Sequence, residues 1–146
     1  MTMPRLSFRT AAPEIYRALE ALTAGAELDP RLGELVRIRA SQLNGCAFCV
    51  DMHCVDAQNA GEDDRRIFAV AAWRESPFFD ERERAALALT EAMTRLGDGG
   101  VPDAIYARAA ELFGEDELVR LMGAIIAINA WNRVAVATAM QPGALA

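Results

Sequence analysis

The feature that most constrains this chain is the regular recurrence of helix start and stop signals along it. Asp29-Pro30 is typical of an N-cap followed by a first-turn proline, and Asn44-Gly45 and Ser76-Pro77 are typical of breaks between elements. No segment alternates apolar and polar residues in the manner of a half-buried strand. Ala and Leu, which lose little conformational freedom in a helix, dominate the apolar residues. We therefore predict an all-α fold.

These signals divide the chain into about seven predicted helices. Asp80 and Glu83 have the spacing of a capping box and are expected to open one of them. The last helix is apolar around most of its circumference, which is typical of a helix in the centre of a core or in a subunit interface. The length of 146 residues fits a single domain, residues 1–146, built as a helical bundle. The expected ranges are about 13–25, 30–43, 46–60, 63–73, 81–96, 102–114 and 115–140.

Charge and apolar patterning exclude several classes of partner. The chain has a net charge of −6 and no basic stripe, so we expect no binding to nucleic acid or to anionic membranes. Residues 1–10 contain no apolar run of the kind that a secretory signal needs. The longest apolar stretch, residues 121–131, is shorter than the ~20 residues of a membrane span. These observations predict a soluble, cytoplasmic protein.

All three cysteines lie between positions 46 and 54. A secreted disulfide scaffold would spread an even number along the chain, so this cluster favours metal binding or redox chemistry. On a helix, Cys46, Cys49 and His53 fall on one stripe, and the i,i+3 spacing places the two cysteine Cα atoms ~5–6 Å apart, as a disulfide tolerates. Cys46 at a helix N-terminus gains from the macrodipole, which favours a thiolate. The pattern predicts thiol–disulfide chemistry with His53 as a base within reach.

Glu34 is predicted to join this stripe across a helical hairpin. If the helices on either side of Asn44-Gly45 fold back on each other, residues equally far from the turn face one another. Glu34 lies ten residues before Asn44 and His53 lies eight after Gly45. At ~1.5 Å per residue the mismatch is only ~3 Å, so the carboxylate could reach the imidazole. Glu34 would then either orient the ring or relay protons itself, and the sequence leaves both roles open.

The same residues allow two other interpretations. A structural zinc site would need four ligands, and beside the stripe the fourth would have to be Cys54, Glu34 or water, so we expect no metal. The cysteine pair could also be inert core thiols, because free cysteine is often buried. Cys54 lies about 100° from His53 around the helix and is expected to be a buried structural thiol.

Several other side chains are expected to be structural. Trp73, Phe78 and Phe79 are the large side chains that an Ala-rich bundle needs in its core or subunit contacts, rather than the lining of a substrate pocket. Asn129 and Asn132 lie in an apolar helix and must find hydrogen bonds, so we expect them to bridge helices or subunits.

The chemistry-bearing pattern resembles the signature of the alkylhydroperoxidase D (AhpD) family, within the carboxymuconolactone decarboxylase-like superfamily. That pattern is Glu34, eleven residues, Cys46-x-x-Cys49, three residues, and His53. Residues 73–85 and the late Asn129-x-x-Asn132-Arg133 extend the similarity to roughly residues 28–136. The resemblance implies an all-helical homo-oligomer, commonly a trimer or hexamer, whose thiols reduce hydroperoxides or pass electrons to a peroxiredoxin.

By the same resemblance, Cys49 is the thiol oxidised to sulfenic acid, Cys46 attacks it to close the disulfide, and His53 and Glu34 form the proton relay. The thiols carry the electrons, so no flavin, haem or metal cofactor is expected. A dithiol or a protein donor, such as a peroxiredoxin or a lipoyl or thioredoxin-like system, would supply reducing equivalents. One departure is Phe48, which stands where the best-known family member has a second histidine.

Two further functions stay open beside the peroxidase. The first is the non-redox decarboxylase or lactone-processing chemistry of the same superfamily, which has no use for a cysteine pair. The second is a non-enzymatic oligomeric module whose disulfide acts as a redox sensor. Replacement of Cys49 by serine would separate the first of these from a peroxidase.

Overall fold

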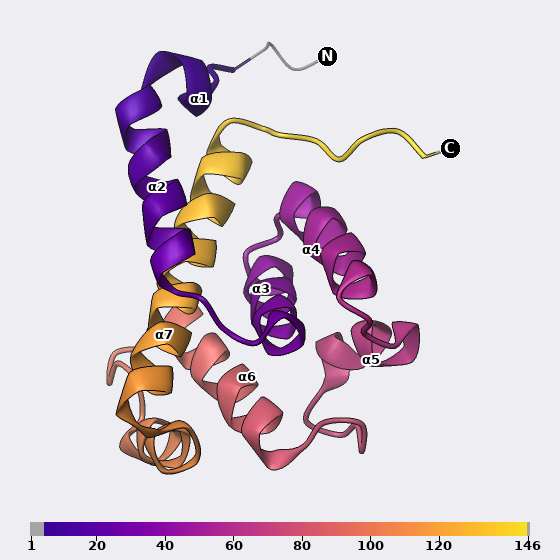
Figure 1. Cartoon of the computed structure of the whole chain (residues 1–146), viewed down its shortest axis with the longest axis vertical. Coiled ribbons are helices and arrows are strands. Elements are labelled where there is room, and N and C mark those ends of the chain that lie inside the picture. The colour runs from indigo at the N-terminus through magenta and orange to yellow at the C-terminus, as the bar shows by residue number, and fades with distance from the viewer. Residues whose placement is uncertain (1–4, 146) are drawn as a thin grey trace.

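The computed structural model describes residues 5–145, and this part of the chain is entirely helical apart from its connections and an isolated bridge between Gly97 and Gly100 (Figure 1). The all-α prediction is confirmed. The elements are α1 (Phe8–Ala11), α2 (Pro13–Gly25), α3 (Pro30–Leu43), α4 (Ala47–Asn59), α5 (Asp64–Ala69), the 3₁₀ helix η1 (Val70–Ala72), α6 (Glu81–Thr94) and α7 (Asp103–Ala137).

Four of the helices, α3, α4, α5 and α6, begin where a side chain accepts a hydrogen bond from an amide of the first turn. The Asp29 carboxylate accepts a hydrogen bond from the Leu32 amide at 3.1 Å and so caps α3. Asp80 and Glu83 form the predicted capping box at the start of α6, with reciprocal hydrogen bonds of 2.8 Å. Cys46 is the N-cap of α4, which confirms that the cysteine pair stands at the start of a helix.

Two details of the predicted helices need correction. The helices expected over 102–114 and 115–140 form the single element α7, although its backbone leaves helical geometry at Gly114, where φ is 69° and ψ is 172°. The predicted break is therefore present as a kink, because a glycine can adopt this conformation without a Cβ clash. The short helix α1 was not predicted, since its four residues carry no periodic pattern.

The centre of the bundle is α3, which packs against α4, α6 and α7 (Figure 1). Leu35, Val36 and Ile38 of α3 are completely buried. α7 is long and apolar enough by composition to cross a membrane, yet it packs against α2, α3, α4 and α6 and contributes Leu121 and Ile125 to the core. The core position is one of the two places predicted for an apolar last helix, and the other, a subunit interface, stays a prediction.

The α3–α4 hairpin brings the chemistry-bearing residues together. Gly45 adopts φ = 64°, a conformation that favours glycine, and the chain reverses there. The amide of Cys46 donates to the carbonyl of Ser41 at 3.0 Å, which ties the start of α4 to the end of α3. The two helices then run side by side in opposite directions (Figure 1), so residues equally distant from the turn face each other.

Candidate functional site

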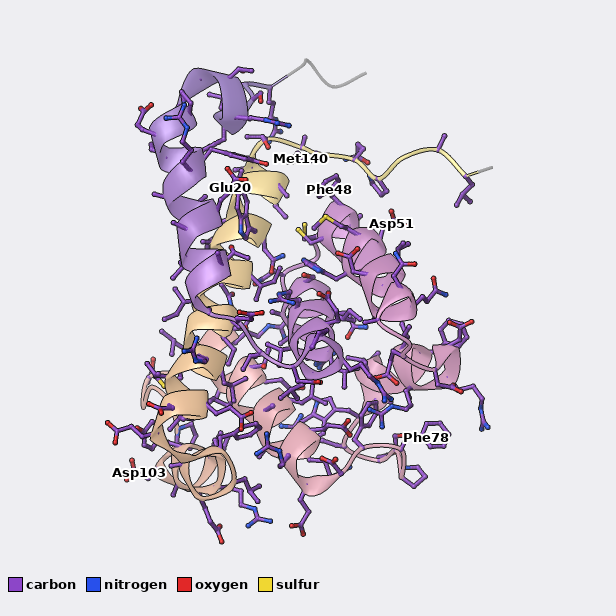
Figure 2. The ribbon with its side chains drawn as sticks, viewed as in Figure 1. Glu20, Phe48, Asp51, Phe78, Asp103 and Met140 are labelled. Carbon is purple, nitrogen blue, oxygen red and sulfur yellow. The ribbon has the colours of Figure 1, made fainter. Side chains whose placement is uncertain are left out.

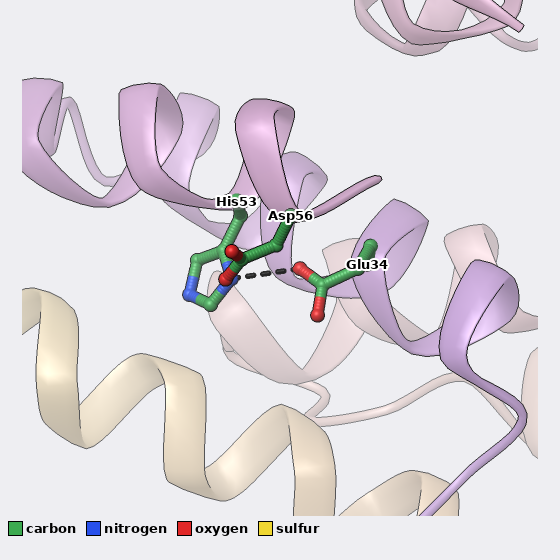
Figure 3. Close-up of side chains that lie close together, drawn as sticks. All are labelled: Glu34, His53 and Asp56. Atoms are coloured by element: carbon green, nitrogen blue, oxygen red, sulfur yellow. Dashed lines mark hydrogen bonds and ion pairs between the residues drawn. The ribbon is translucent and has the colours of Figure 1, made fainter. Parts of the chain in front are cut away.

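The contact between Glu34 and His53 is the first feature of the site. Oε2 of Glu34 lies 2.8 Å from Nδ1 of His53 (Figure 3), as the hairpin geometry predicts. A carboxylate can only accept, so Nδ1 carries the proton and Nε2 of a neutral ring is left as the basic nitrogen. The other carboxylate oxygen accepts from Nη1 of Arg37 at 2.8 Å. Both site side chains are almost enclosed, which holds the ring in one orientation.

The two cysteines are free thiols stacked on the first turn of α4. Sγ of Cys46 accepts a hydrogen bond from the backbone amide of Cys49 at 3.3 Å, so this sulfur serves as the helix cap. Both residues are only 2% exposed. Burial raises the pKa of Cys49 to about 12, and the hydrogen bond with Cys46 and its charge add to the rise. The resting Cys49 is therefore a neutral thiol that needs a base.

A cleft of about 840 Å³ opens beside these residues, between α2 and α4 and the end of α7. Glu20 on α2, Phe48 on α4 and Met140 after α7 surround this region in Figure 2. Cys49 and His53 line the cleft, whereas Cys46 does not. The remaining walls are mainly apolar and aromatic, and they include Phe8, Tyr16, Phe48, Met52, Trp131 and Val134.

The far wall of the cleft is fixed by contacts between α2 and α7. Nε1 of Trp131 donates to Oγ1 of Thr23 at 2.8 Å, and the ring of Tyr16 meets that of Trp131 edge to face with centroids 5.1 Å apart. These contacts join residues more than a hundred positions apart, so sequence patterns gave no sign of them. The wall of the cleft formed by α2 and α7 is therefore held in place by aromatic packing and a hydrogen bond.

The residues that were predicted to be structural lie in the core and between helices. Trp73 and Phe79 are buried in a second core cluster away from the cleft, which confirms their structural role. Cys54 is partly buried against that same cluster, and burial raises its pKa above the ordinary value. Asn132 bridges α7 to α3 as predicted, through a hydrogen bond from its Nδ2 to Oγ of Ser41. It also opposes the rise of the Cys49 pKa, an effect that its position in an apolar helix did not reveal.

Potential metal ligands gather at a different point from the thiols. Within residues 5–145, the group whose ligand atoms lie within 4.8 Å of one another is Glu34, His53 and Asp56 (Figure 3). Asp56 is half exposed, and its Oδ2 lies 3.9 Å from Nδ1 of His53, the nitrogen that already meets Glu34. No thiol belongs to this group, so the geometry does not favour a zinc site built on the cysteine pair.

Comparison with known proteins places the chain in a family. Residues 13–92, which contain Glu34, both cysteines of the pair and His53, match the model of the carboxymuconolactone decarboxylase family. The chain belongs to the carboxymuconolactone decarboxylase family. It is 41% identical to the uncharacterised protein YdfG of Bacillus subtilis over 136 residues, which cover 91% of this chain and 92% of the relative. It is also 38% identical to the uncharacterised YnjA of Escherichia coli over 99 residues, or 67% of this chain and 53% of YnjA.

A solved structure with the same fold supports an AhpD-like membership within that family. A protein of unknown function from Agrobacterium tumefaciens, ATU0492, described as a candidate antioxidant defence protein AhpD, superposes with a TM-score of 0.91 at 37% identity. The match covers 98% of this chain and all of that one. A variant of the debrominase Bmp8, solved in complex with 2,3,4-tribromopyrrole, has a TM-score of 0.80 over 91% of this chain and 73% of its own, at 20% identity. The latter shares the fold alone.

Proposed function

We propose that this member of the carboxymuconolactone decarboxylase family is an alkylhydroperoxidase-type enzyme that reduces organic hydroperoxides with the Cys46–Cys49 thiol pair. One observation carries the proposal: Cys49 and His53 line the same cleft, while Cys46 lies behind Cys49 and contacts it. A substrate in the cleft meets one thiol and one base, and the second thiol is in place to finish the reaction.

In the first step His53 removes the proton of Cys49. The hydrogen-bonding contacts of the described residues include none between these two side chains, so the proton passes through solvent or through the hydroperoxide group of the substrate. The Cys49 thiolate attacks the terminal peroxide oxygen, and the O–O bond breaks. An alcohol leaves with the proton held by His53, and Cys49 becomes a sulfenic acid.

In the second step the sulfur of Cys46 attacks that of Cys49. An S–S bond forms, the S–O bond breaks, and the hydroxide leaves as water with the Cys46 proton. The peroxide thus gains two electrons and the thiol pair loses two. Glu34 accepts the Nδ1 proton of His53 in a hydrogen bond throughout, and so stabilises the imidazolium that forms between proton transfers.

The shape of the cleft supports organic rather than hydrogen peroxide as the substrate. Its volume of about 840 Å³ is suited to a drug-sized molecule, and its walls are mainly apolar and aromatic. An alkyl or aryl group would bury apolar surface there, with a gain of about 25 cal/mol for each Å². The smallest peroxide gains nothing from these walls, so its KM should be much higher.

The proposal also covers the electron donor, the oligomeric state and the cellular location of the enzyme. An external dithiol or a protein donor, such as a peroxiredoxin or a lipoyl or thioredoxin-like system, would reduce the disulfide after each turnover. We also propose a homo-oligomer, a trimer or hexamer, in the cytoplasm, where the free thiols would be kept reduced.

The test is peroxide consumption with a matched pair of variants. Turnover of cumene hydroperoxide or hydrogen peroxide by wild type, Cys49→Ser and Cys54→Ser is measured with dithiothreitol as donor. In a second assay without donor, the protein thiols are titrated after a single stoichiometric pulse of peroxide. Cys54→Ser makes the same chemical change on the same helix, but away from the cleft. We expect two thiols lost per chain in wild type and Cys54→Ser, no turnover in Cys49→Ser, and a lower KM for cumene hydroperoxide.

Other results would assign the chain to one of the alternative functions. Unchanged thiols in wild type would exclude the peroxidase and leave the non-redox chemistry of the family, in which Cys49→Ser should stay active. A slow, stoichiometric loss of two thiols without turnover, together with a conformational change, would identify a redox-sensing module.

A further inference from the structure

Asn132 is a buried polar residue beside the thiol pair. It is 1% exposed, and Ala135, one helical turn further along α7, belongs to the same buried cluster as both cysteines. A buried carboxamide has two N–H donors and one oxygen acceptor to satisfy, and its two ends are chemically distinct. Which end faces Cys49 therefore decides what Asn132 does to that sulfur.

The orientation can be fixed by starting from a neighbouring amide, Asn129. Nη1 of Arg133 donates to Oδ1 of Asn129 at 3.1 Å, and a guanidinium can only donate. The Asn129 Nδ2 donates to the backbone carbonyl of Ile125 at 2.9 Å, and a carbonyl can only accept. Both contacts make Oδ1 of Asn129 an acceptor and leave no freedom to flip this group.

Asn44 links Asn129 to Asn132 and so fixes the orientation of the Asn132 amide. The Asn44 side chain contacts Oδ1 of Asn129 at 2.9 Å and must do so with Nδ2 as the donor. That Nδ2 also lies 2.9 Å from Oδ1 of Asn132, which must accept. Nδ2 of Asn132 is then the end that faces Ser41, whose Oγ it meets at 3.0 Å, and the hydrogen bonds of residues 5–145 include no acceptor for its second N–H.

We propose that Asn132 is a further catalytic residue, whose side-chain amide donates to the Cys49 sulfur and stabilises its thiolate, and that Asn129 and Asn44 are positioning residues that hold this donor in place. A donor on the sulfur favours its charged form, and the hydrogen bond from Asn132 opposes the effect of burial on the Cys49 pKa. The amide would donate to the sulfur while His53 removes the proton, and this stabilisation would end when the thiolate attacks the peroxide and becomes a neutral sulfenic acid.

The catalytic meaning of this inference rests on the proposed function, but its test does not. In a Cys46→Ser, Cys54→Ser background, Cys49 is the single thiol of the chain. The rate of its alkylation by iodoacetamide is measured from pH 7 to 11 with Asn132 intact, as Asn132→Ala and as Asn132→Asp. Asn59→Asp is the matched control, because it adds the same charge at an exposed position on the cysteine-bearing helix.

We expect Asn132→Ala to slow alkylation about tenfold at pH 8 and at the neighbouring pH values, since a rise of one pKa unit is a tenfold loss of thiolate. Asn132→Asp should slow it further, because a carboxylate repels the thiolate. Asn59→Asp should match the background. Circular dichroism establishes that each variant is folded. A folded Asn132→Ala or Asn132→Asp protein that is alkylated as fast as the background at pH 8 would overturn the inference, whether or not the enzyme reduces peroxides.

Discussion

Replacement of His53 by glutamine should make the reaction depend on hydroxide, because the Cys49 thiol is poorly acidic in its site. Burial raises the pKa of Cys49 to about 12. At pH 7, five units lower, only about one molecule in 10⁵ would carry the thiolate without help. A base that works at neutral pH is therefore needed, and Nε2 of His53 is the basic nitrogen that the cleft supplies.

The size of the effect follows from the loss of that base. General-base catalysis is worth about 10²–10⁴ in rate, so we expect the His53→Gln variant to lose this factor at pH 7. Glutamine retains an amide N–H that can donate to Glu34, so the packing around the carboxylate is largely kept. Between about pH 8 and 11 the rate of the variant should rise roughly tenfold per pH unit as hydroxide forms the thiolate, while that of wild type rises less steeply.

The assay is the rate of peroxide consumption under saturating dithiothreitol across pH 7 to 11. Asp56→Asn is the control, because Asp56 is a half-exposed carboxylate 3.9 Å from the same ring nitrogen and is given no role. Folding must be followed at each pH. The folded-state pKa of Cys49 exceeds the ordinary value of 9.0, so the free energy of unfolding should fall as pH rises from 9 to 12. A His53→Gln protein as fast as wild type at pH 7, or one that stays folded yet inactive at every pH, would refute the reasoning.

Three further predictions concern the stability of the bundle, measured as the free energy of urea unfolding. Burial alone would raise the pKa of Glu62, but hydrogen bonds from Arg66 and Arg31 bring it below the ordinary 4.5. Glu62→Gln should therefore cost about 2–3 kcal/mol at pH 7, and the difference should shrink as pH falls below 4.5. Gly114→Ala should cost about 1–3 kcal/mol from backbone strain at φ = 69°, since open space surrounds the added Cβ and no clash contributes. Asp80→Ala should cost about 1 kcal/mol because it removes the N-cap of α6. The loss of an exposed carboxylate that caps no helix should leave the free energy of unfolding unchanged.

Much of the fold was accessible from the sequence because its determinants are local. A capping carboxylate such as Asp29 or Asp80 acts on amides within the next turn, and glycine at position 45 permits a reversal that few other residues allow. The contact of Glu34 with His53 was also accessible, since a hairpin of two helices pairs residues by their distance from the turn. The two errors, the short α1 and the merging at Gly114, concern lengths and boundaries that local signals define poorly.

The sequence by itself thus determined which segments are helical and that two thiols, an imidazole and a carboxylate share one hairpin. The tertiary structure alone decided that Cys49, rather than Cys46, meets a cleft, because the opposite wall is built by Trp131 and the distant α2. It also decided the acidity of Cys49 and the direction in which the Asn132 amide faces. The burial of a group and the direction of its hydrogen bonds depend on neighbours that are distant in the sequence. The periodicity within one helix does not identify those neighbours.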